Sequence, residues 1–205
     1  MTSFDWIRYV IAFLVVVTGP GSAAFWFAIH PFATFWRRVG TVWAYIAGFG
    51  VYAVSAVILF AFSPALLSLD WGMNVFTIVP GVAFVAVAVV LRWQWRRHLT
   101  VPVLFGAPEV GAGSPGKLLT DGIYARIRHP RYAEFLLTFL GYSLISNYPA
   151  AYAATALVAG QIAALIPLEE RELAGRFGAA YEEYRGRVPA LIPAFGRRRW
   201  TPSQG

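Results

Sequence analysis

The pattern of hydrophobic and polar positions divides the chain into long apolar runs separated by short polar segments. Three runs in the first half cover Ile7–Ile29, Val42–Phe62 and Met73–Leu91. A further apolar stretch, Tyr132–Leu168, is interrupted by Ser-Asn-Tyr-Pro at 146–149, a composition typical of a tight turn. Because about 20 apolar residues suffice to cross a bilayer as a helix, the pattern predicts five transmembrane helices. A shorter re-entrant hairpin is the alternative for the last two.

We therefore expect an all-α polytopic membrane bundle formed by a single domain, residues 1–205. Residues 1–98 would carry the first three spans, 99–131 a loop, and 132–205 the helical hairpin and the C-terminal segment. From Pro167 to about Arg187, apolar residues recur at helical spacing among charges. This pattern predicts an amphipathic helix that begins at Pro167 and lies along the membrane surface.

Composition and charge agree with a membrane protein and give it an orientation. Hydrophobic residues make up 58% of the chain and charged residues 13%, against about 25% charged in soluble proteins. In a chain this apolar, the net charge of +7 indicates topology and contact with anionic lipids rather than nucleic acid. With the predicted spans, all but one of the 17 Lys and Arg residues fall on one side. The positive-inside rule makes that side cytoplasmic and places the N-terminus outside.

The residue types exclude several kinds of site. The chain has no cysteine, so thiolate metal sites and a cysteine nucleophile are excluded, and its 3 histidines argue against a histidine metal cluster. We therefore expect no metal. The first residues, MTSFDWIR, lack a basic region before their apolar run, so we expect that run to be a retained span rather than a signal peptide.

Residues 121–134, DGIYARIRHPRYAE, gather charge between two apolar regions. Apolar and polar residues alternate from Ile123 to Arg128, which predicts an extended segment. Pro130 suits the first position of a helix, so the fourth span is expected to begin there. The positive end of that helix dipole, beside Arg128 and Arg131, would attract a carboxylate or a phosphate. On charge alone, a basic loop touching lipid phosphates is the simpler interpretation.

Acidic residues near position 170 form the second candidate site. Glu172 and Glu183 each have an arginine four residues on, so both are interpreted as ordinary surface pairs. Glu169 and Glu170 have no partner at that spacing. Unpaired carboxylates at a membrane boundary are costly unless a cationic group binds them, so these two indicate a binding site.

Taken together, the two segments resemble a known family. The first reads GIYARIRHPRY at 122–132, and the second, after the hairpin, reads EERELAGRFGAAYEEYRGRVPALIP at 169–193. This order and spacing is similar to the isoprenylcysteine carboxyl methyltransferase and phospholipid methyltransferase superfamily of integral membrane enzymes. The family pattern is roughly G-x-Y-x-x-x-R-H-P-x-Y-x-G followed by E-E-x-x-L-x-x-x-F-G-x-x-Y-x-x-Y. Where the first family motif ends in glycine, this chain has Glu134.

The resemblance implies a methyltransferase that uses S-adenosylmethionine and releases S-adenosylhomocysteine, with its cofactor site on the cytoplasmic face. Matched by position, the expected cofactor-binding residues are Tyr124, His129, Pro130, Tyr132, Glu169, Glu170, Tyr181 and Tyr184. Arg128 is the expected catalytic residue, because its guanidinium could hold an anionic acceptor such as a carboxylate or thiolate.

The acceptor is expected to be lipophilic or small and to offer a carboxylate, thiol, oxygen or amine. Methyl transfer from a sulfonium needs neither a metal nor a covalent enzyme intermediate, so the residue content is compatible with it. The alternative is a non-catalytic membrane protein that keeps the scaffold for binding or assembly, with Glu134 as the mark of divergence.

Overall fold

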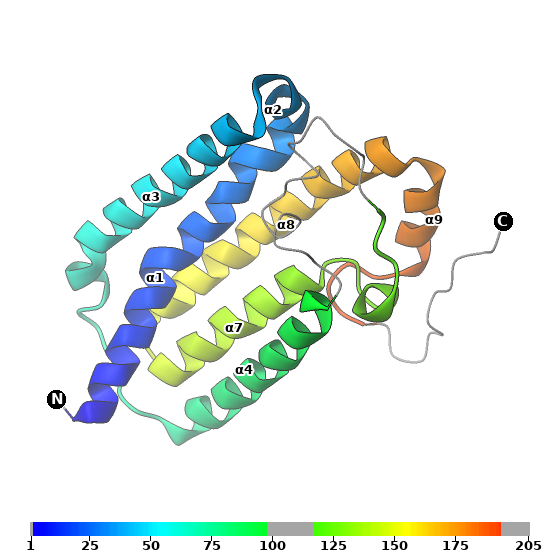
Figure 1. Cartoon of the computed structure of the whole chain (residues 1–205). Coiled ribbons are helices and arrows are strands. Elements are labelled where there is room, and N and C mark those ends of the chain that lie inside the picture. The colour runs from blue at the N-terminus through cyan, green and yellow to red at the C-terminus, as the bar shows by residue number, and fades with distance from the viewer. Residues whose placement is uncertain (1, 98–116, 194–205) are drawn as a thin grey trace.

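The computed structural model describes residues 2–97 and 117–193, and over these residues it is helical with no strand (Figure 1). The helices are α1 (Ser3–Ile29), the 3-10 helix η1 (His30–Phe32), α2 (Ala33–Val39), α3 (Thr41–Leu66), α4 (Val75–Arg96), the 3-10 helix η2 (Gly122–Ala125), α7 (Pro130–Ser146), α8 (Pro149–Phe177) and α9 (Ala179–Arg187). The predicted all-α fold is therefore confirmed.

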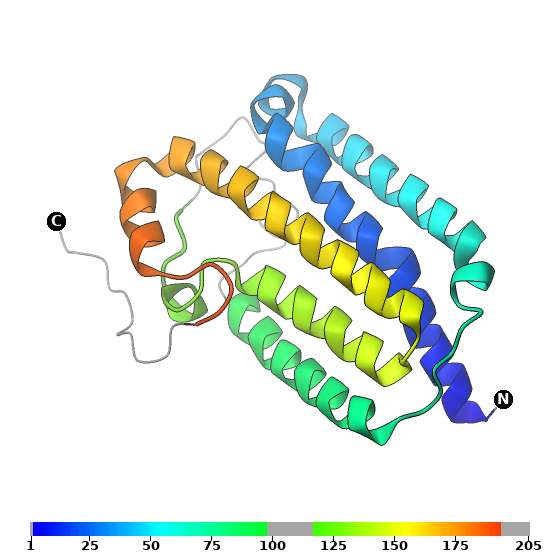
Figure 2. The same ribbon diagram turned by 180° about the vertical axis from the view of Figure 1, so that it is seen from behind.

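The long helices lie side by side and alternate in direction along the chain. Across Figures 1 and 2 their order is α3, α1, α8, α7 and α4. The C-terminal end of α4 and the start of α7 lie at one end of the bundle, which we name the motif end; α2 and α9 are also at this end. The opposite end, which holds the start of α1 and the connection from α7 to α8, we name the turn end.

Within the described residues, four helical segments are long and apolar enough to cross a membrane: Ser3–Val39, Thr41–Leu66, Val75–Arg96 and Pro149–Phe177. α7 has 17 residues, a length of about 25 Å, slightly below a hydrocarbon thickness of about 30 Å. A fifth span formed by α7 therefore remains a prediction, and so does the orientation of the bundle in the membrane. The predicted turn between α7 and α8 is confirmed, with Asn147 in the left-handed conformation at φ 57°.

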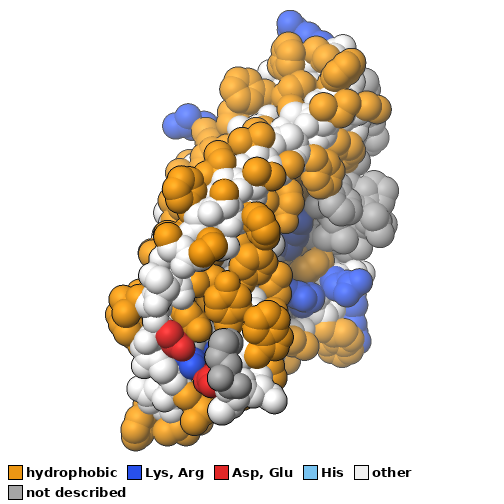
Figure 3. All heavy atoms as spheres, turned by 90° about the vertical axis from the view of Figure 1, so that its left-hand side faces the viewer, with side chains coloured by type: hydrophobic (Ala, Val, Ile, Leu, Met, Phe, Trp, Pro, Cys, Tyr) orange, Lys and Arg blue, Asp and Glu red, His pale blue; other side chains and the backbone are white. Residues whose placement is uncertain are grey.

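Apolar side chains cover the outside of the bundle. In the side view of Figure 3, hydrophobic atoms dominate the face, and acidic side chains appear near its lower end. Large apolar residues on α3 and α4 are well exposed, for example Val54 at 60%, Phe60 at 61% and Phe76 at 85%. Such a surface is costly in water but matches lipid chains, as the hydropathy predicted.

The boundary of the last membrane helix differs from the prediction. α8 passes through Pro167 and continues to Phe177, so the surface helix does not begin at the proline. A proline removes one backbone hydrogen bond, but packing of the flanking turns against neighbouring helices can hold the helix together. The break comes at Gly178, whose φ of 56° favours glycine, and α9 follows it.

Glycines bring α4 and α7 into close contact. A Cβ built on Gly141 would lie 2.8 Å from the carbonyl oxygen of Gly81 and 2.7 Å from Val85 Cγ2. A Cβ on Gly81 would in turn lie 2.9 Å from the Gly141 oxygen. The two backbones therefore touch directly, as small residues allow between membrane helices.

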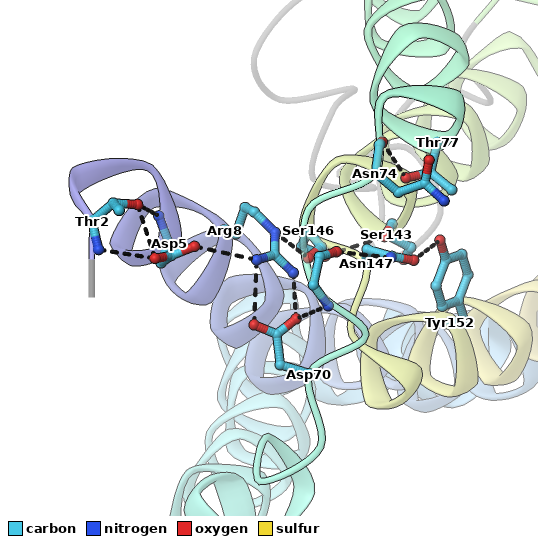
Figure 4. A network of polar contacts seen from close by, with 11 residues as sticks. Thr2, Asp5, Arg8, Asp70, Asn74, Thr77, Ser143, Ser146, Asn147 and Tyr152 are labelled. Carbon is cyan, nitrogen blue, oxygen red and sulfur yellow. Dashed lines mark hydrogen bonds and ion pairs between the residues drawn. The ribbon is translucent and has the colours of Figure 1, made fainter.

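A polar network closes the turn end (Figure 4). Arg8 is 1% exposed; its Nη1 and Nη2 donate to the carboxylate of Asp70, and its Nε donates to the Ser146 carbonyl at 2.9 Å. This buried guanidinium joins α1, the loop before α4, and the turn between α7 and α8. The network lies at the opposite end from the two sequence motifs and therefore contributes to the scaffold.

Candidate functional site at the motif end

The segment before α7 is more compact than predicted. Residues Gly122–Ala125 form the 3-10 helix η2 instead of the predicted extended segment, and Tyr124 and Ala125 are both buried. Local turns replace the extended form, because Tyr124 N–H donates to Asp121 O at 3.0 Å and Arg126 N–H donates to Ile123 O at 3.0 Å. The period-two pattern was misleading because both faces of this segment are covered.

The Arg-His-Pro motif is held by the C-terminal segment. The N–H groups of Arg128 and His129 donate to the carbonyls of Pro189 and Ala190, both at 2.9 Å. α7 then begins at Pro130 as predicted, with no side-chain cap. The first motif therefore depends on the Val-Pro-Ala end of the second for its backbone position.

Glu170 joins the two motifs. Its Oε1 accepts hydrogen bonds from Arg128 Nε at 2.9 Å and Nη2 at 2.6 Å, and lies 3.1 Å from His129 Nε2. Glu169 Oε2 lies 3.5 Å from His129 Nδ1. Both carboxylates, expected to lack protein partners, are thus paired across the α7–α8 hairpin. The sequence argument considered only partners one helical turn away.

Arg128 makes most of its hydrogen bonds to other groups of the protein. Besides Glu170, its Nη1 donates to the Arg185 carbonyl at 3.0 Å and to the Val188 carbonyl. The side chain is 11% exposed. Of its five N–H groups, four are therefore engaged and one on Nη2 remains.

His129 sits between the two glutamates and carries a positive charge at neutral pH. Burial would lower its pKa, but the carboxylates of Glu169 and Glu170 outweigh burial and raise the pKa of His129 to about 9. Its ring also stacks on Tyr132 with centroids 5.5 Å apart. The cluster formed by Arg128, His129, Glu169 and Glu170 is therefore two matched ion pairs, and we name it the motif cluster.

Tyrosines of α9 pack beside the motif cluster. Tyr181 and Tyr184 are 1% and 2% exposed, and burial raises the pKa of both hydroxyls, so both stay neutral. Tyr184 donates to the Tyr124 carbonyl at 2.7 Å and so fixes η2 against α9. The Tyr181 hydroxyl is buried with no hydrogen-bond partner in the described part of the chain.

Buried polar atoms without a hydrogen bond concentrate at the motif end. Over residues 2–97 and 117–193, these atoms are His30 Nδ1, Trp95 Nε1, Gln161 Oε1, Glu169 Oε2, Glu172 Oε2, Arg176 Nε and Nη1, and Tyr181 Oη. All but Gln161 lie near the ends of helices that meet there. Since an unsatisfied buried group costs about 1–3 kcal/mol, this clustering marks the motif end as the candidate binding site.

Sequence reasoning missed a second charged cluster beside the first. Arg37 of α2 donates to Glu172 Oε1 at 2.5 Å, and Arg176 Nη2 lies 3.4 Å from Glu172 Oε2. The predicted pair with Arg176 is confirmed, but Glu172 is 11% exposed, so the interpretation as an ordinary surface pair was wrong. Trp95, in the last turn of α4, is also buried, at 8% exposure.

Glu134, at the position of the family glycine, is part of the α4–α7 contact. Its Oε1 accepts from Arg92 Nε at 3.0 Å and Nη2 at 2.5 Å, and from the Thr138 hydroxyl at 3.0 Å. The side chain is 6% exposed. An ion pair therefore joins the helices here, while Gly81 and Gly141 bring the two backbones together nearer the turn end.

The predicted site residues converge at the motif end. The structure brings Arg128, His129, Glu169 and Glu170 into direct contact and stacks Tyr132 on His129. Tyr124, Pro130, Tyr181 and Tyr184 surround them as supports. Among the described residues, no group of three or more His, Cys, Asp or Glu is placed to hold a metal ion.

The sequence is similar to those of known methyltransferases. The chain is 39% identical over 77 residues to a protein-S-isoprenylcysteine O-methyltransferase of Schizosaccharomyces pombe, covering 37% of this chain and 33% of that protein. It is 40% identical over 78 residues to protein-S-isoprenylcysteine O-methyltransferase B of Arabidopsis thaliana, covering 38% and 40%. It is also 40% identical over 105 residues to methanethiol S-methyltransferase 2 of Bradyrhizobium diazoefficiens, covering 47% and 36%.

The matched segment thus spans well under half the length of each of these relatives. No solved structure matches the chain. A family model described as phospholipid methyltransferase matches residues 76–180, which include α4, the Arg-His-Pro motif, the hairpin and both glutamates. Because that match covers half of the chain and contains the motif cluster, the protein belongs to the phospholipid methyltransferase family of membrane proteins.

Proposed function

We propose that the protein is an S-adenosylmethionine-dependent methyltransferase that acts at the membrane surface on a lipophilic or small acceptor. The observation that carries the proposal is the buried motif cluster at the end of an apolar helical bundle, inside the segment that the family model matches. Relatives are named for transfer to isoprenylcysteine oxygen and to methanethiol sulfur, which supports the reaction class and leaves the acceptor open.

The side chains at the motif end suit this cofactor. When bound, S-adenosylmethionine supplies a sulfonium methyl group, whose transfer is an in-line displacement. Among the described residues, Glu169 Oε2 has only the 3.5 Å contact to His129 Nδ1 and no hydrogen bond, so it is suited to accept one from an ammonium group. The Tyr181 hydroxyl can donate or accept, and the rings of Tyr181 and Tyr184, with centroids 6.2 Å apart, offer an aromatic wall.

The motif cluster would contribute mainly by orientation. Charged His129 fixes Glu169 on one side and Glu170 on the other, so the carboxylates are already ordered before any ligand arrives. Arg128 holds Glu170 and the chain at Val188, and its remaining Nη2 N–H is the group we expect to contact an anionic acceptor. In this scheme Arg128 contacts the acceptor while Glu169 and Tyr181 contact the cofactor.

The location in the bundle suits reactants of opposite polarity. The motif end lies where apolar helices meet basic residues, which the positive-inside rule assigns to the cytoplasm. A polar cofactor would arrive from water at that side, and a lipophilic acceptor would arrive along the lipid-covered surface. Exclusion of water from such a pocket strengthens the electrostatic interactions inside it.

The first test is a transfer reaction with the full chain in nanodiscs. The protein would be incubated with S-adenosylmethionine labelled in its methyl group and a total lipid and small-thiol extract, and products identified by mass spectrometry. We expect a labelled, saturable product. Saturable cofactor binding without any labelled product would instead support a non-catalytic protein that keeps the scaffold.

The second test concerns the residues. We expect Glu170→Gln and His129→Ala each to weaken binding of S-adenosylhomocysteine in calorimetry, because each leaves part of the motif cluster unpaired. Glu183→Gln is the matched control, since Glu183 is 41% exposed and pairs only with Arg187 one turn away. Unchanged affinity in both cluster variants would refute the proposed site.

A further inference from the structure

Glu172 is shared by two arginines from distant parts of the chain. Arg37 comes from α2, ahead of the segment that the family model matches, and Arg176 comes from the last turn of α8. Both guanidinium groups contact the Glu172 carboxylate. Arg37 Nη2 lies 2.5 Å from Oε1, and Arg176 Nη2 lies 3.4 Å from Oε2. We name these three residues the Glu172 cluster.

Arg176 is buried without enough acceptors. Its side chain is 9% exposed, yet Nε and Nη1 have no hydrogen-bond partner among the described residues. The Phe177 ring, 4.9 Å from the guanidinium carbon, offers a cation–π contact but accepts no strong hydrogen bond. A buried guanidinium with unfilled N–H groups is costly, and an anion is the group that would fill them.

The local charge balance points the same way. Glu170 is matched by Arg128, and Glu169 is matched by charged His129. In the Glu172 cluster, Arg37 makes the short contact to Glu172, at 2.5 Å, and Arg176 makes the longer one, at 3.4 Å, so the carboxylate neutralises Arg176 only weakly. A planar carboxylate suits the guanidinium N–H donors of Arg176.

A buried histidine, His30, lies near the Glu172 cluster. His30 is 5% exposed, stacks on Trp26 with centroids 5.2 Å apart, and has its Nδ1 buried without a partner. Its helix η1 packs against α8, and the charges of Glu169 and Glu172 both act on it. His30 and Arg176 therefore each bring an unpartnered polar atom close to the acidic turn of α8 that holds Glu169 and Glu172.

We propose that the Glu172 cluster is a carboxylate-binding subsite, in which Arg176 supplies the donors and the segment from His30 to Arg37 completes the wall. The inference deepens the proposed function, because the carboxylate would belong either to the cofactor or to the methyl acceptor. Arg37 is 32% exposed, so the carboxylate would approach from the side of α2. The subsite would make α1 and α2, which precede the family match, part of the binding machinery.

The first arm uses calorimetry with two nucleosides on the full chain in nanodiscs. S-adenosylhomocysteine carries the carboxylate, and 5′-methylthioadenosine lacks the whole amino-acid portion. If the cofactor supplies the carboxylate, Arg176→Gln should weaken S-adenosylhomocysteine binding about 10- to 100-fold and leave methylthioadenosine binding unchanged. Wild-type binding of S-adenosylhomocysteine in the same experiment tests the proposed function separately.

The second arm follows the acceptor. After methyl transfer into a total lipid extract, alkali releases methanol from methyl esters but not from methylated amines or thiols. If the acceptor supplies the carboxylate, Arg176→Gln should lower the alkali-labile product about 10-fold or more while S-adenosylhomocysteine affinity stays unchanged. Arg187→Gln is the control, because Arg187 belongs to an exposed pair and is itself 61% exposed.

A variant that should strengthen binding separates a role in binding from a role in folding. Glu172→Gln keeps the shape but removes the negative charge that competes for both arginines, so binding of the carboxylate-bearing ligand should strengthen severalfold. A purely structural cluster would show unchanged or weaker binding in this variant. The proposal is overturned if Arg176→Gln changes neither the affinity for S-adenosylhomocysteine nor the yield of alkali-labile product. It is also overturned if Glu172→Gln increases neither that affinity nor that yield.

Discussion

His129 should make the stability of the protein depend on pH in a way that one substitution removes. Its pKa is raised from 6.5 to about 9 by Glu169 and Glu170 against the opposing effect of burial. A raised pKa means that the stabilisation is fully present below pH 6.5 and is lost as pH rises through about 9. The difference between about 9 and 6.5, at about 1.4 kcal/mol per unit, amounts to roughly 3 kcal/mol.

The assay is denaturant unfolding of the detergent-solubilised protein at pH values from neutral to alkaline, for the wild type and for His129→Gln. Other groups titrate over this range, so the quantity that matters is the difference between the two proteins. We expect the wild type to be the more stable at neutral pH and this advantage to shrink above pH 9. If the difference is independent of pH, the histidine is not charged between the two glutamates and the argument for ordered ion pairs fails.

The contacts between helices, and Glu134 at the position of the family glycine, give three further predictions. Gly141→Ala should destabilise the protein by about 1–3 kcal/mol, since the new Cβ meets the Gly81 carbonyl at 2.8 Å, whereas Gly160→Ala, with no atom within 4 Å, should be neutral or slightly stabilising in thermal melts. Asp70→Ala should destabilise by roughly 3 kcal/mol and by more than Arg8→Gln, because it leaves the buried guanidinium with only the longer ion pair to Asp5, at 3.5 Å; equal losses in denaturant unfolding would contradict this. Glu134→Gln should lower the melting temperature but leave S-adenosylhomocysteine affinity unchanged in calorimetry, because its ion pair joins α4 to α7.

Local signals in the sequence predicted the helices well because membrane helices satisfy their own backbone hydrogen bonds. The apolar runs, the turn at Asn147 and the start of α7 at Pro130 are each encoded within a few residues. The predicted helix start at Pro167 and the predicted extended segment before α7 were wrong because tertiary packing decided the conformation at both places. In both places a local preference was weaker than the contacts made by the folded chain.

The site was predicted as two separate halves, and what joins them is not local. Glu170 lies 42 residues from Arg128, and Glu172 lies 135 residues from Arg37. Spacing of one helical turn identified Glu169 and Glu170 as lacking a neighbour but could not name Arg128 or His129 as the partner. The family resemblance supplied the association of the two motifs, and the geometry shows that they share hydrogen bonds.

The length of the hairpin explains how the two motifs meet. α7 runs from the motif end to the turn end over 17 residues. α8 runs back, and needs a similar number of residues before it reaches the height of the first motif. Each residue advances a helix by about 1.5 Å and turns it by about 100°, so both the height and the facing of Glu170 are set by the count between the motifs. The backbone bonds from Arg128 and His129 to Pro189 and Ala190 then fix the first motif onto the segment that follows α9. A charged cluster can therefore be buried at the end of a lipid-covered bundle, because the hairpin brings each charge to a partner of opposite sign.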